Sequence, residues 1–175
     1  REDREVKVLV AVDQSDCSKA AVSSVLDRSW PSGTTFEVIH VVEPLAAQYA
    51  LADARSLRAM LEADQEIFNC AQELINEKTF QLAAIFGKDR VTGQVIEGHI
   101  AESIVAQAKI MQADLIVMGS HGRTGFDRIF LGSIAAKVAG QAPCSIEIVK
   151  QKMTDDEKQV VAGKTVTKAI MEAHH

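Results

Sequence analysis

Residues 114–139 read DLIVMGSHGRTGFDRIFLGSIAAKVA, and this stretch decides the fold. Its opening run, DLIVM, is rich in strand-forming residues and predicts a β-strand over residues 114–118. Its closing run, residues 133–139, predicts a short helix. Between them lie glycines at positions 119, 122, 125 and 132. The stretch therefore predicts a strand, a glycine-rich loop and a helix in direct succession.

The same alternation of strand and helix occupies most of the chain. Ser15 is a candidate N-cap for the first helix, and an apolar stripe of Ile67, Ala71, Leu74 and Ile75 marks a long one. Residues 45–54 show no clear period and are interpreted as a loop or irregular helix. Further strands are predicted over residues 6–12, 34–42, 91–98 and 144–149, and further helices over residues 57–86 and 100–113.

Alternating strands and helices predict right-handed βαβ crossovers and a parallel sheet that is covered on both faces. Ligands of such sheets bind beyond the carboxyl ends of the strands, near the point where the strand order reverses. Asp13, Val41 and Gly119 lie at three predicted carboxyl ends. They are therefore candidate binding residues.

Composition sets the broad class of protein. The chain has 175 residues, of which 47% are hydrophobic and 25% charged, with a net charge of −5. These values predict one soluble globular domain and argue against nucleic acid or an anionic membrane as the main partner. We expect the domain to span residues 1–150, and residues 151–175 to form a C-terminal helical extension or tail. The final His174 and His175 are compatible with a tag remnant.

The three cysteines, Cys17, Cys70 and Cys144, are odd in number and far apart. This spacing favours neither a zinc site nor a disulfide framework. We expect buried free thiols in a reducing cytoplasm. The sequence shows no signal peptide and no membrane span.

The glycine-rich stretch carries the chemistry. Glycine lacks a Cβ and allows positive φ, so successive backbone N–H groups can turn toward one anion. A helix N-terminus adds unpaired N–H donors, and Gly132 and Ser133 open the predicted helix. This combination predicts a phosphate site, and the alternative is a glycine-lined turn without a ligand. A G-x-G-x-x-G motif is absent, and residues 163–165 lack the upstream glycine of a P-loop.

The spacing of Gly119, Gly122 and the Gly132–Ser133 pair resembles the nucleotide-binding signature of the universal stress protein family. VLVAVDQSDCSKAA, VIHVVEP and ADLIVMGSHGRTG resemble other family segments, and the resemblance covers about residues 6–150. It implies a Rossmann-like or flavodoxin-like three-layer α/β sandwich with a five-stranded parallel sheet in the order 3-2-1-4-5. It also implies a cytoplasmic homodimer that forms through the last strand. Where the family usually has Pro-Val-Leu, this chain has Ser145, Ile146 and Glu147, and Glu147 needs a partner or solvent.

The resemblance further implies a site for ATP, AMP or another adenine nucleotide, with Mg²⁺ or Mn²⁺ as a companion ion. The implied contacts run from the adenosine to the phosphates. They involve Ala11, Val12 and Asp13 at the adenosine, Val41 at the adenine, Met118 and Gly119 at the ribose, and His121, Gly122, Arg123, Gly132, Ser133 and Ile134 at the phosphates.

Several of these residues have a plainer interpretation. His121 is a candidate for phosphate contact or acid–base chemistry, and it can equally shape the turn. Arg123 is a candidate phosphate ligand or a solvated charge. Asp13 is a candidate metal or ribose ligand or a helix-start residue. His40 and His99 are interpreted as packing or surface residues.

Three functions are consistent with the sequence. The first is an ATP-binding regulatory protein of the stress response. The second is a slow ATPase or self-phosphorylating enzyme, although no catalytic base is evident beside the predicted phosphates. The third is a dimeric interaction protein that needs no nucleotide.

Overall fold

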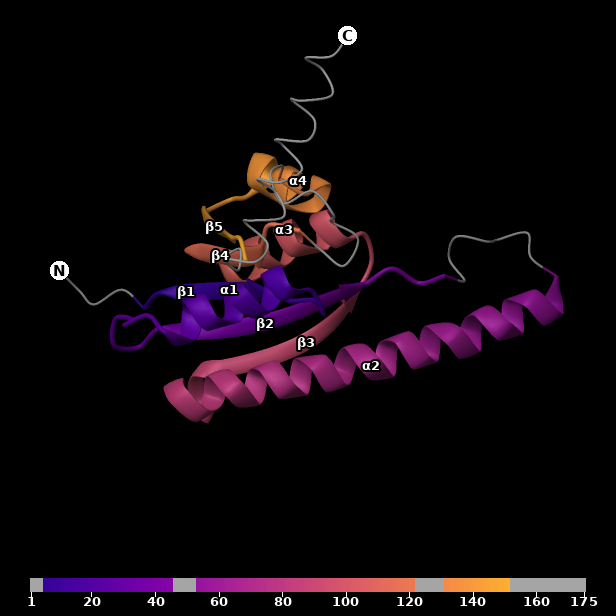
Figure 1. Ribbon diagram of the computed structural model, residues 1–175, viewed down its shortest axis with the longest axis horizontal. Helices are drawn as coiled ribbons and strands as arrows, with labels where there is room; N and C mark the ends of the chain where they lie inside the picture. The colour runs from indigo at the N-terminus through magenta and orange to yellow at the C-terminus, as the bar shows by residue number, and fades with distance from the viewer. Residues whose placement is uncertain (1–4, 46–52, 122–130, 152–175) are drawn as a thin grey trace, which may run out of the picture.

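The computed structural model describes residues 5–45, 53–121 and 131–151. Five strands form one parallel sheet in the order β3-β2-β1-β4-β5 (Figure 1). The predicted fold class and strand order are therefore confirmed, and each strand lies within one residue of its predicted bounds. The strands are β1 (Lys7–Ala11), β2 (Thr35–Val42), β3 (Val91–Glu97), β4 (Leu115–Gly119) and β5 (Ser145–Val149).

Helices cover both faces of the sheet, as the strand–helix alternation predicts. They are α1 (Asp16–Leu26), α2 (Ala54–Phe86), the short 3₁₀ helix η2 (Lys88–Arg90), α3 (Ile100–Met111) and α4 (Ser133–Gln141). Successive side chains of a strand point to opposite faces. Val8 and Val10 of β1 accordingly pack in one core cluster with residues of α1 and α2. Leu9 packs in a second cluster with residues of α3 and α4, so the molecule has three layers.

Helix α2 is much longer than the sheet it covers. Its 33 residues span about 50 Å, whereas the eight residues of β2 span about 27 Å. Its carboxyl-terminal half packs on β2 and β3, and its amino-terminal part extends past the sheet (Figure 1). Ala71, Leu74 and Ile75 are buried as predicted. Ile67 was expected in the same buried stripe but is 39% exposed, because it lies toward the extending part.

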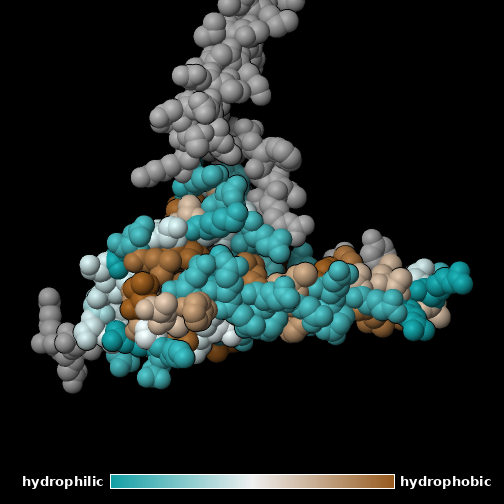
Figure 2. Space-filling view, turned by 60° about the horizontal axis from the view of Figure 1, so that its bottom comes forward, coloured by the Kyte–Doolittle hydropathy of each residue, from teal (hydrophilic) through white to brown (hydrophobic). Residues whose placement is uncertain are grey.

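The extending part of α2 leaves apolar side chains at the surface. Leu57 and Leu61 are exposed there. Figure 2 shows apolar and polar surface side by side along this projecting helix. The core that fixes α2 is therefore confined to its second half.

Two predictions about individual side chains are settled by their surroundings. The thiols are free, but Cys70 is exposed and Cys17 and Cys144 are only partly buried, so the expectation of buried thiols was wrong. Glu147 of β5 finds its partners in α1, where Ser24 Oγ donates at 2.7 Å and Arg28 Nη2 at 2.5 Å. Burial opposes ionisation of Glu147, yet these two donors hold the pKa of its carboxyl below the ordinary value.

Within the described ranges, no helix has both the length and the apolar character needed to cross a membrane. The tail predicted over residues 151–175 lies, apart from residue 151, outside the described residues.

Candidate functional site

A cavity of about 610 Å³ opens at the carboxyl ends of β1, β2 and β4. The strand order reverses between β1 and β4, so the cavity lies at the switch point where open α/β sheets bind ligands. Its volume falls in the usual range for small-molecule sites. Ten residues proposed from the sequence line it: Ala11, Val12, Asp13, Val41, Met118, Gly119, His121, Gly132, Ser133 and Ile134. Gly122 and Arg123 lie outside the described residues.

Asp13 is held in place where β1 ends and α1 begins. Its Oδ1 atom accepts hydrogen bonds from the backbone N–H of Ser15 at 2.9 Å and from Ser15 Oγ at 2.5 Å. Its own N–H donates to Ser18 Oγ at 2.9 Å. Among the described residues, Oδ2 of Asp13 has no hydrogen-bond partner. One carboxylate oxygen is thus fixed by the protein, and the other is available as an acceptor in the cavity.

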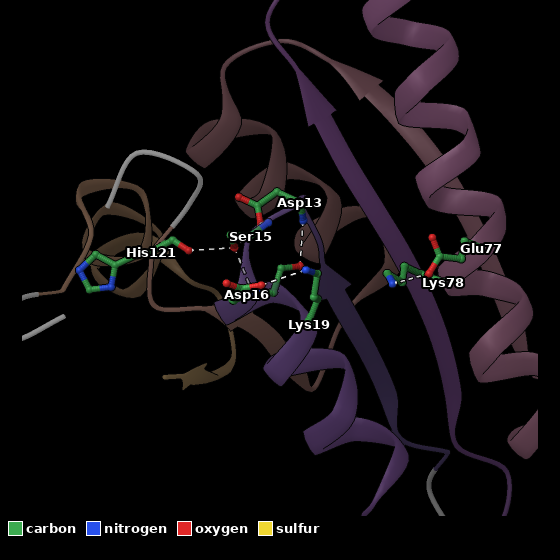
Figure 3. Close-up of polar contacts among 8 residues, drawn as sticks. Asp13, Ser15, Asp16, Lys19, Glu77, Lys78 and His121 are labelled. Atoms are coloured by element: carbon green, nitrogen blue, oxygen red, sulfur yellow. Dashed lines mark hydrogen bonds and ion pairs between the residues drawn. The ribbon is translucent and has the colours of Figure 1, made fainter. Parts of the chain in front are cut away.

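Ser15 joins the two sides of the switch point. Its hydroxyl accepts from Ser18 N at 3.1 Å and so caps α1 as predicted. The same oxygen lies 3.1 Å from the carbonyl oxygen of His121, beyond the end of β4 (Figure 3). A serine hydroxyl has one hydrogen, so it donates either to Asp13 or to His121 at any moment. Ser15 therefore links the Asp13 carboxylate to the segment that follows β4.

Gly119 and Gly132 are required by close backbone approach. A Cβ on Gly119 would lie 2.9 Å from the carbonyl carbon of Cys17 and from the nitrogen of Ser18, in the first turn of α1. A Cβ on Gly132 would lie 2.7 Å from the carbonyl oxygen of Ser120. Neither glycine has a positive φ, although the sequence argument invoked that freedom. The two glycines let α1 and α4 close against the end of β4.

The N-terminus of α4 differs from those of the other described α-helices. Ser15 caps α1, Asp53 caps α2 with two bonds of 3.0 Å, and the Glu43 carboxylate accepts from Ile100 N at 3.4 Å in α3. The N-cap of α4 is Gly132, which has no side chain to accept a bond. In the part of the chain that the structure describes, the first-turn N–H groups of α4 have no capping side chain, and the residues of this turn line the cavity.

His121 is anchored by its neighbour. Its Nδ1 atom lies 3.1 Å from Oγ of Ser120, which is buried, and the Ser120 hydroxyl also lies 3.6 Å from Cys17 Sγ. With one ring nitrogen engaged and its carbonyl facing Ser15, His121 shapes the turn after β4. The arrangement favours the plainer of the two interpretations given to this residue.

Sequence reasoning missed several residues of the lining. His40 was interpreted as packing or surface, yet it lines the cavity, and so do Glu43 and Ile67. The position of His40 next to Val41 near a strand end was a usable signal. For Ile67 no local signal existed, because only the path of α2 brings it there. The other missed residues are Ser18, Ile39, Val42, Ile100, Ile104, Ser120 and Ala135.

Among the described residues, the charged side chains that line the cavity are all acidic. Two carboxylates, Asp13 and Glu43, line it, whereas none of its described lining residues is a lysine or arginine. Within the same described residues, no group of three or more His, Cys, Asp or Glu side chains is placed to hold a metal ion. An anion in this cavity would therefore meet the backbone N–H groups and the Ser133 hydroxyl of α4. Hydroxyl or amino groups of a ligand would meet the carboxylates.

A doubly covered parallel sheet with a cavity at its switch point defines an α/β protein of the flavodoxin-like class. The sequence profile of the universal stress protein family matches residues 6–150, and the chain therefore belongs to that family. It is 30% identical over 147 residues to "Universal stress protein MJ0531" of Methanocaldococcus jannaschii, with 83% of this chain and 82% of the relative covered.

Solved structures share the fold. The hypothetical protein MJ0577 superposes with a TM-score of 0.73 and 23% identity, over 85% of this chain and 97% of the other. A universal stress protein in complex with cAMP has a TM-score of 0.58 and 20% identity, with 82% and 96% covered. An Arabidopsis thaliana family protein with AMP bound has a TM-score of 0.51 and 17% identity, with 84% and 92% covered.

Proposed function

We propose that this protein binds an adenine nucleotide, with ATP as its ligand, and acts as a regulatory switch of the stress response. The observation that carries the proposal is that the uncapped first turn of α4 and the Asp13 carboxylate line one cavity. Backbone N–H groups at a helix N-terminus suit phosphate, and a free carboxylate oxygen suits the hydroxyl groups of ribose. The site residues in this proposal are the ten described above, together with Gly122 and Arg123.

The apolar lining supports a nucleoside as the uncharged part of the ligand. Ile39 and Val41 of β2 and Met118 of β4 are buried residues that line the cavity on the two sides of β1. Such a wall suits the flat apolar faces of a purine. AMP and cAMP, which two fold neighbours contain, share their adenosine half with ATP.

A divalent cation, Mg²⁺ or Mn²⁺, belongs to this proposal because of charge. ATP would bring several negative charges to a cavity whose described side chains already include Asp13 and Glu43. The described residues offer no three-ligand metal site, so the ion would enter on the phosphates, as Mg²⁺ commonly does. The hydroxyl of Ser133, at the phosphate end of the cavity, is the group that would meet it.

Calorimetry tests the proposal directly. We expect AMP and ATP to bind, with ATP dependent on Mg²⁺ or Mn²⁺, and we expect a nucleotide in the extract of heat-denatured protein. Absence of binding by every adenine nucleotide would overturn the proposal. Equal affinity for AMP and ATP, with or without the metal, would leave adenine-nucleotide binding in place and remove the preference for ATP.

The proposal includes a homodimer in the cytoplasm. β5 is an edge strand, and its outer edge can pair with a second copy. Equilibrium sedimentation should give twice the monomer mass. A proline at Ile146 or Ile148 should return the monomer, because both residues direct their N–H groups away from β4, whereas Val149, of opposite parity, bonds Ser120 N beyond the end of β4. A wild-type monomer at all concentrations would contradict this part.

A further inference from the structure

His40 lies at the nucleoside end of the cavity. It belongs to β2, one residue before Val41; it is half-buried and lines the cavity. The strands meet the cavity in the order β2, β1, β4, with neighbours about 4.8 Å apart. A ligand with its phosphate at α4 and its ribose at Asp13 would therefore bring its base to β2. This argument rests on the proposed nucleotide function.

The protein fixes the tautomer of His40. Its Nδ1 atom lies 2.6 Å from the carbonyl oxygen of Val12. A carbonyl oxygen only accepts hydrogen bonds, so Nδ1 must carry the hydrogen. In the neutral ring, Nε2 is then a bare nitrogen that can only accept a hydrogen bond.

The Nε2 atom of His40 is unpaired and accessible. It has no hydrogen-bond partner among the described residues. In that part of the chain, Thr79 Oγ1 is the one side-chain nitrogen or oxygen that is fully buried without a partner. Because Nε2 is unpaired and is not among the fully buried atoms, it must reach accessible space. His40 lines the cavity, which is the accessible space next to it.

The surroundings of Nε2 favour a ligand that donates. The polar side chains at this end are the carboxylates of Asp13 and Glu43, which accept hydrogen bonds when ionised, and no described lysine or arginine lines the cavity. A purine with a 6-amino group offers a donor to an acceptor nitrogen. A 6-oxo purine offers an acceptor in the same position, which the neutral His40 ring cannot satisfy.

We propose that His40 is a specificity-determining residue of the nucleotide site, and that its Nε2 atom accepts a hydrogen bond from the 6-amino group of the purine. The Val12 carbonyl is the positioning group, because it keeps the ring hydrogen on Nδ1 and so leaves Nε2 as an acceptor. Selection for adenine over hypoxanthine or guanine then comes from a side chain of β2.

The test compares three nucleotides that differ at one position of the base. Calorimetry would use AMP, purine riboside 5′-monophosphate, which lacks the 6-amino group, and IMP, which carries a 6-oxo group. Since a neutral hydrogen bond contributes about 0.5–1.5 kcal/mol, wild-type protein should bind AMP about 2- to 12-fold more tightly than the purine riboside nucleotide. IMP should bind more weakly still.

The His40→Phe variant should bind AMP and the purine riboside nucleotide with equal affinity. Lys109→Phe is the control, because Lys109 is exposed and lies outside the cavity lining, and it should keep the wild-type ratio. Equal affinities in wild-type protein, or an unchanged ratio in His40→Phe, would overturn the inference about His40. Failure of wild-type protein to bind any of the three would instead overturn the proposed function.

Two wild-type measurements keep the inference testable if His40→Phe does not fold. The comparison of the three nucleotides needs no variant. In long-range ¹H–¹⁵N spectra, the His40 ring should appear as the Nδ1–H tautomer, and AMP should shift its Nε2 resonance more than the purine riboside nucleotide does. An Nε2–H tautomer, or identical shifts with both nucleotides, would contradict the inference.

Discussion

The two ends of the cavity present different kinds of polar group. At the β2 and β1 end, the polar groups are side chains, and each is fixed by a second bond: Asp13 by Ser15 and His40 by the Val12 carbonyl. At the α4 end, the polar groups are backbone N–H donors after Gly132, with the Ser133 hydroxyl beside them. One end accepts hydrogen bonds and the other donates them.

This difference decides how each end responds to substitution. A side-chain acceptor can be altered with little effect on the fold, since the backbone around it stays. A backbone donor is changed only through the path of the chain. At Gly132 that path is sensitive to substitution, because an added Cβ would lie 2.7 Å from the Ser120 carbonyl oxygen. The donor end should therefore be the more sensitive to mutation.

Gly132→Val should have the largest effect. The added side chain must displace the Ser120 carbonyl or move the first turn of α4, so that N–H groups lose their common direction. Charge-assisted hydrogen bonds contribute about 1.5–3 kcal/mol each, and loss of two should weaken AMP binding by at least about 100-fold. Calorimetry gives the affinity, and circular dichroism checks the fold.

Gly140→Ala is the control for this change, because it lies in the same helix and nothing lies within 4 Å of the added Cβ. It should leave binding unchanged and stabilise the protein by about 0.5–1 kcal/mol. If folded Gly132→Val binds AMP as wild type does, the donor end of the site is not formed by α4.

Asp13→Asn should have the next largest effect. The amide oxygen can still accept the two bonds from Ser15, so the start of α1 is preserved. The second atom becomes an NH₂ donor, which cannot accept from a ligand hydroxyl. Because a bond to a charged acceptor contributes about 1.5–3 kcal/mol, AMP affinity should fall about 10- to 160-fold.

A phosphate-only probe separates the two ends in that variant. Inorganic pyrophosphate meets the α4 end alone, so its binding should be the same or tighter in Asp13→Asn, which removes a negative charge. Equal weakening of AMP and pyrophosphate would argue against a division of the cavity into two ends.

Ser15→Ala should act on stability more than on affinity. It removes the cap of α1, which should lower the free energy of unfolding by about 0.5–2 kcal/mol, and it also removes the bond to His121. Ser15→Thr keeps the hydroxyl and should retain most of the stability. Urea denaturation monitored by circular dichroism measures both variants, and equal losses in the two would show that the hydroxyl is not responsible.

The smallest effect is expected outside the cavity, at Glu147 and Arg28. The folded pKa of Glu147 is below its ordinary value of 4.5, so its contribution to stability is present above that pH and is lost as the pH falls through the folded pKa. Arg28→Met should lower stability at pH 7 by only about 0.2–1 kcal/mol. It should also reduce the loss between pH 5 and 3, with AMP affinity unchanged.

Urea denaturation at pH 7, 5 and 3 measures the contribution of Arg28. A variant as sensitive to acid as wild type would mean that Arg28 does not hold the Glu147 carboxylate. A change in AMP affinity would mean that this pair is coupled to the cavity.

Much of the fold was predictable because its signals are local. Each strand has a short apolar run, and Ser15 precedes its helix with the side chain that a cap requires. Where a contact depends on distant elements, the prediction was incomplete. Ile67 has the period of a core residue but lies toward the part of α2 that extends past the sheet, and 39% of it is exposed. The residues around Ile67 do not indicate where along α2 the sheet ends.

The candidate site divides in the same way. Asp13, Val41 and Gly119 follow from strand ends, because parallel strands bring their carboxyl ends to one edge. His40 was interpreted as a packing or surface residue although it follows the same strand-end rule as Val41. Which of its ring nitrogens is free could not be predicted, because that depends on the Val12 carbonyl, 28 residues away in the chain. The missing capping side chain of α4 is informative only in comparison with α3. There, the carboxylate of Glu43, which follows β2, accepts a hydrogen bond from the first turn, a contact that the local sequence of α3 does not reveal.

The sequence by itself determined the order of strands and helices, the glycine spacing and the family to which the chain belongs. These features depend on local propensity and on residue types at fixed separations. The tertiary structure decided why two of the glycines are needed, which helix N-terminus stays open to the cavity and which nitrogen of His40 is free. Each of those depends on distances between segments far apart in the chain, and only packing sets such distances.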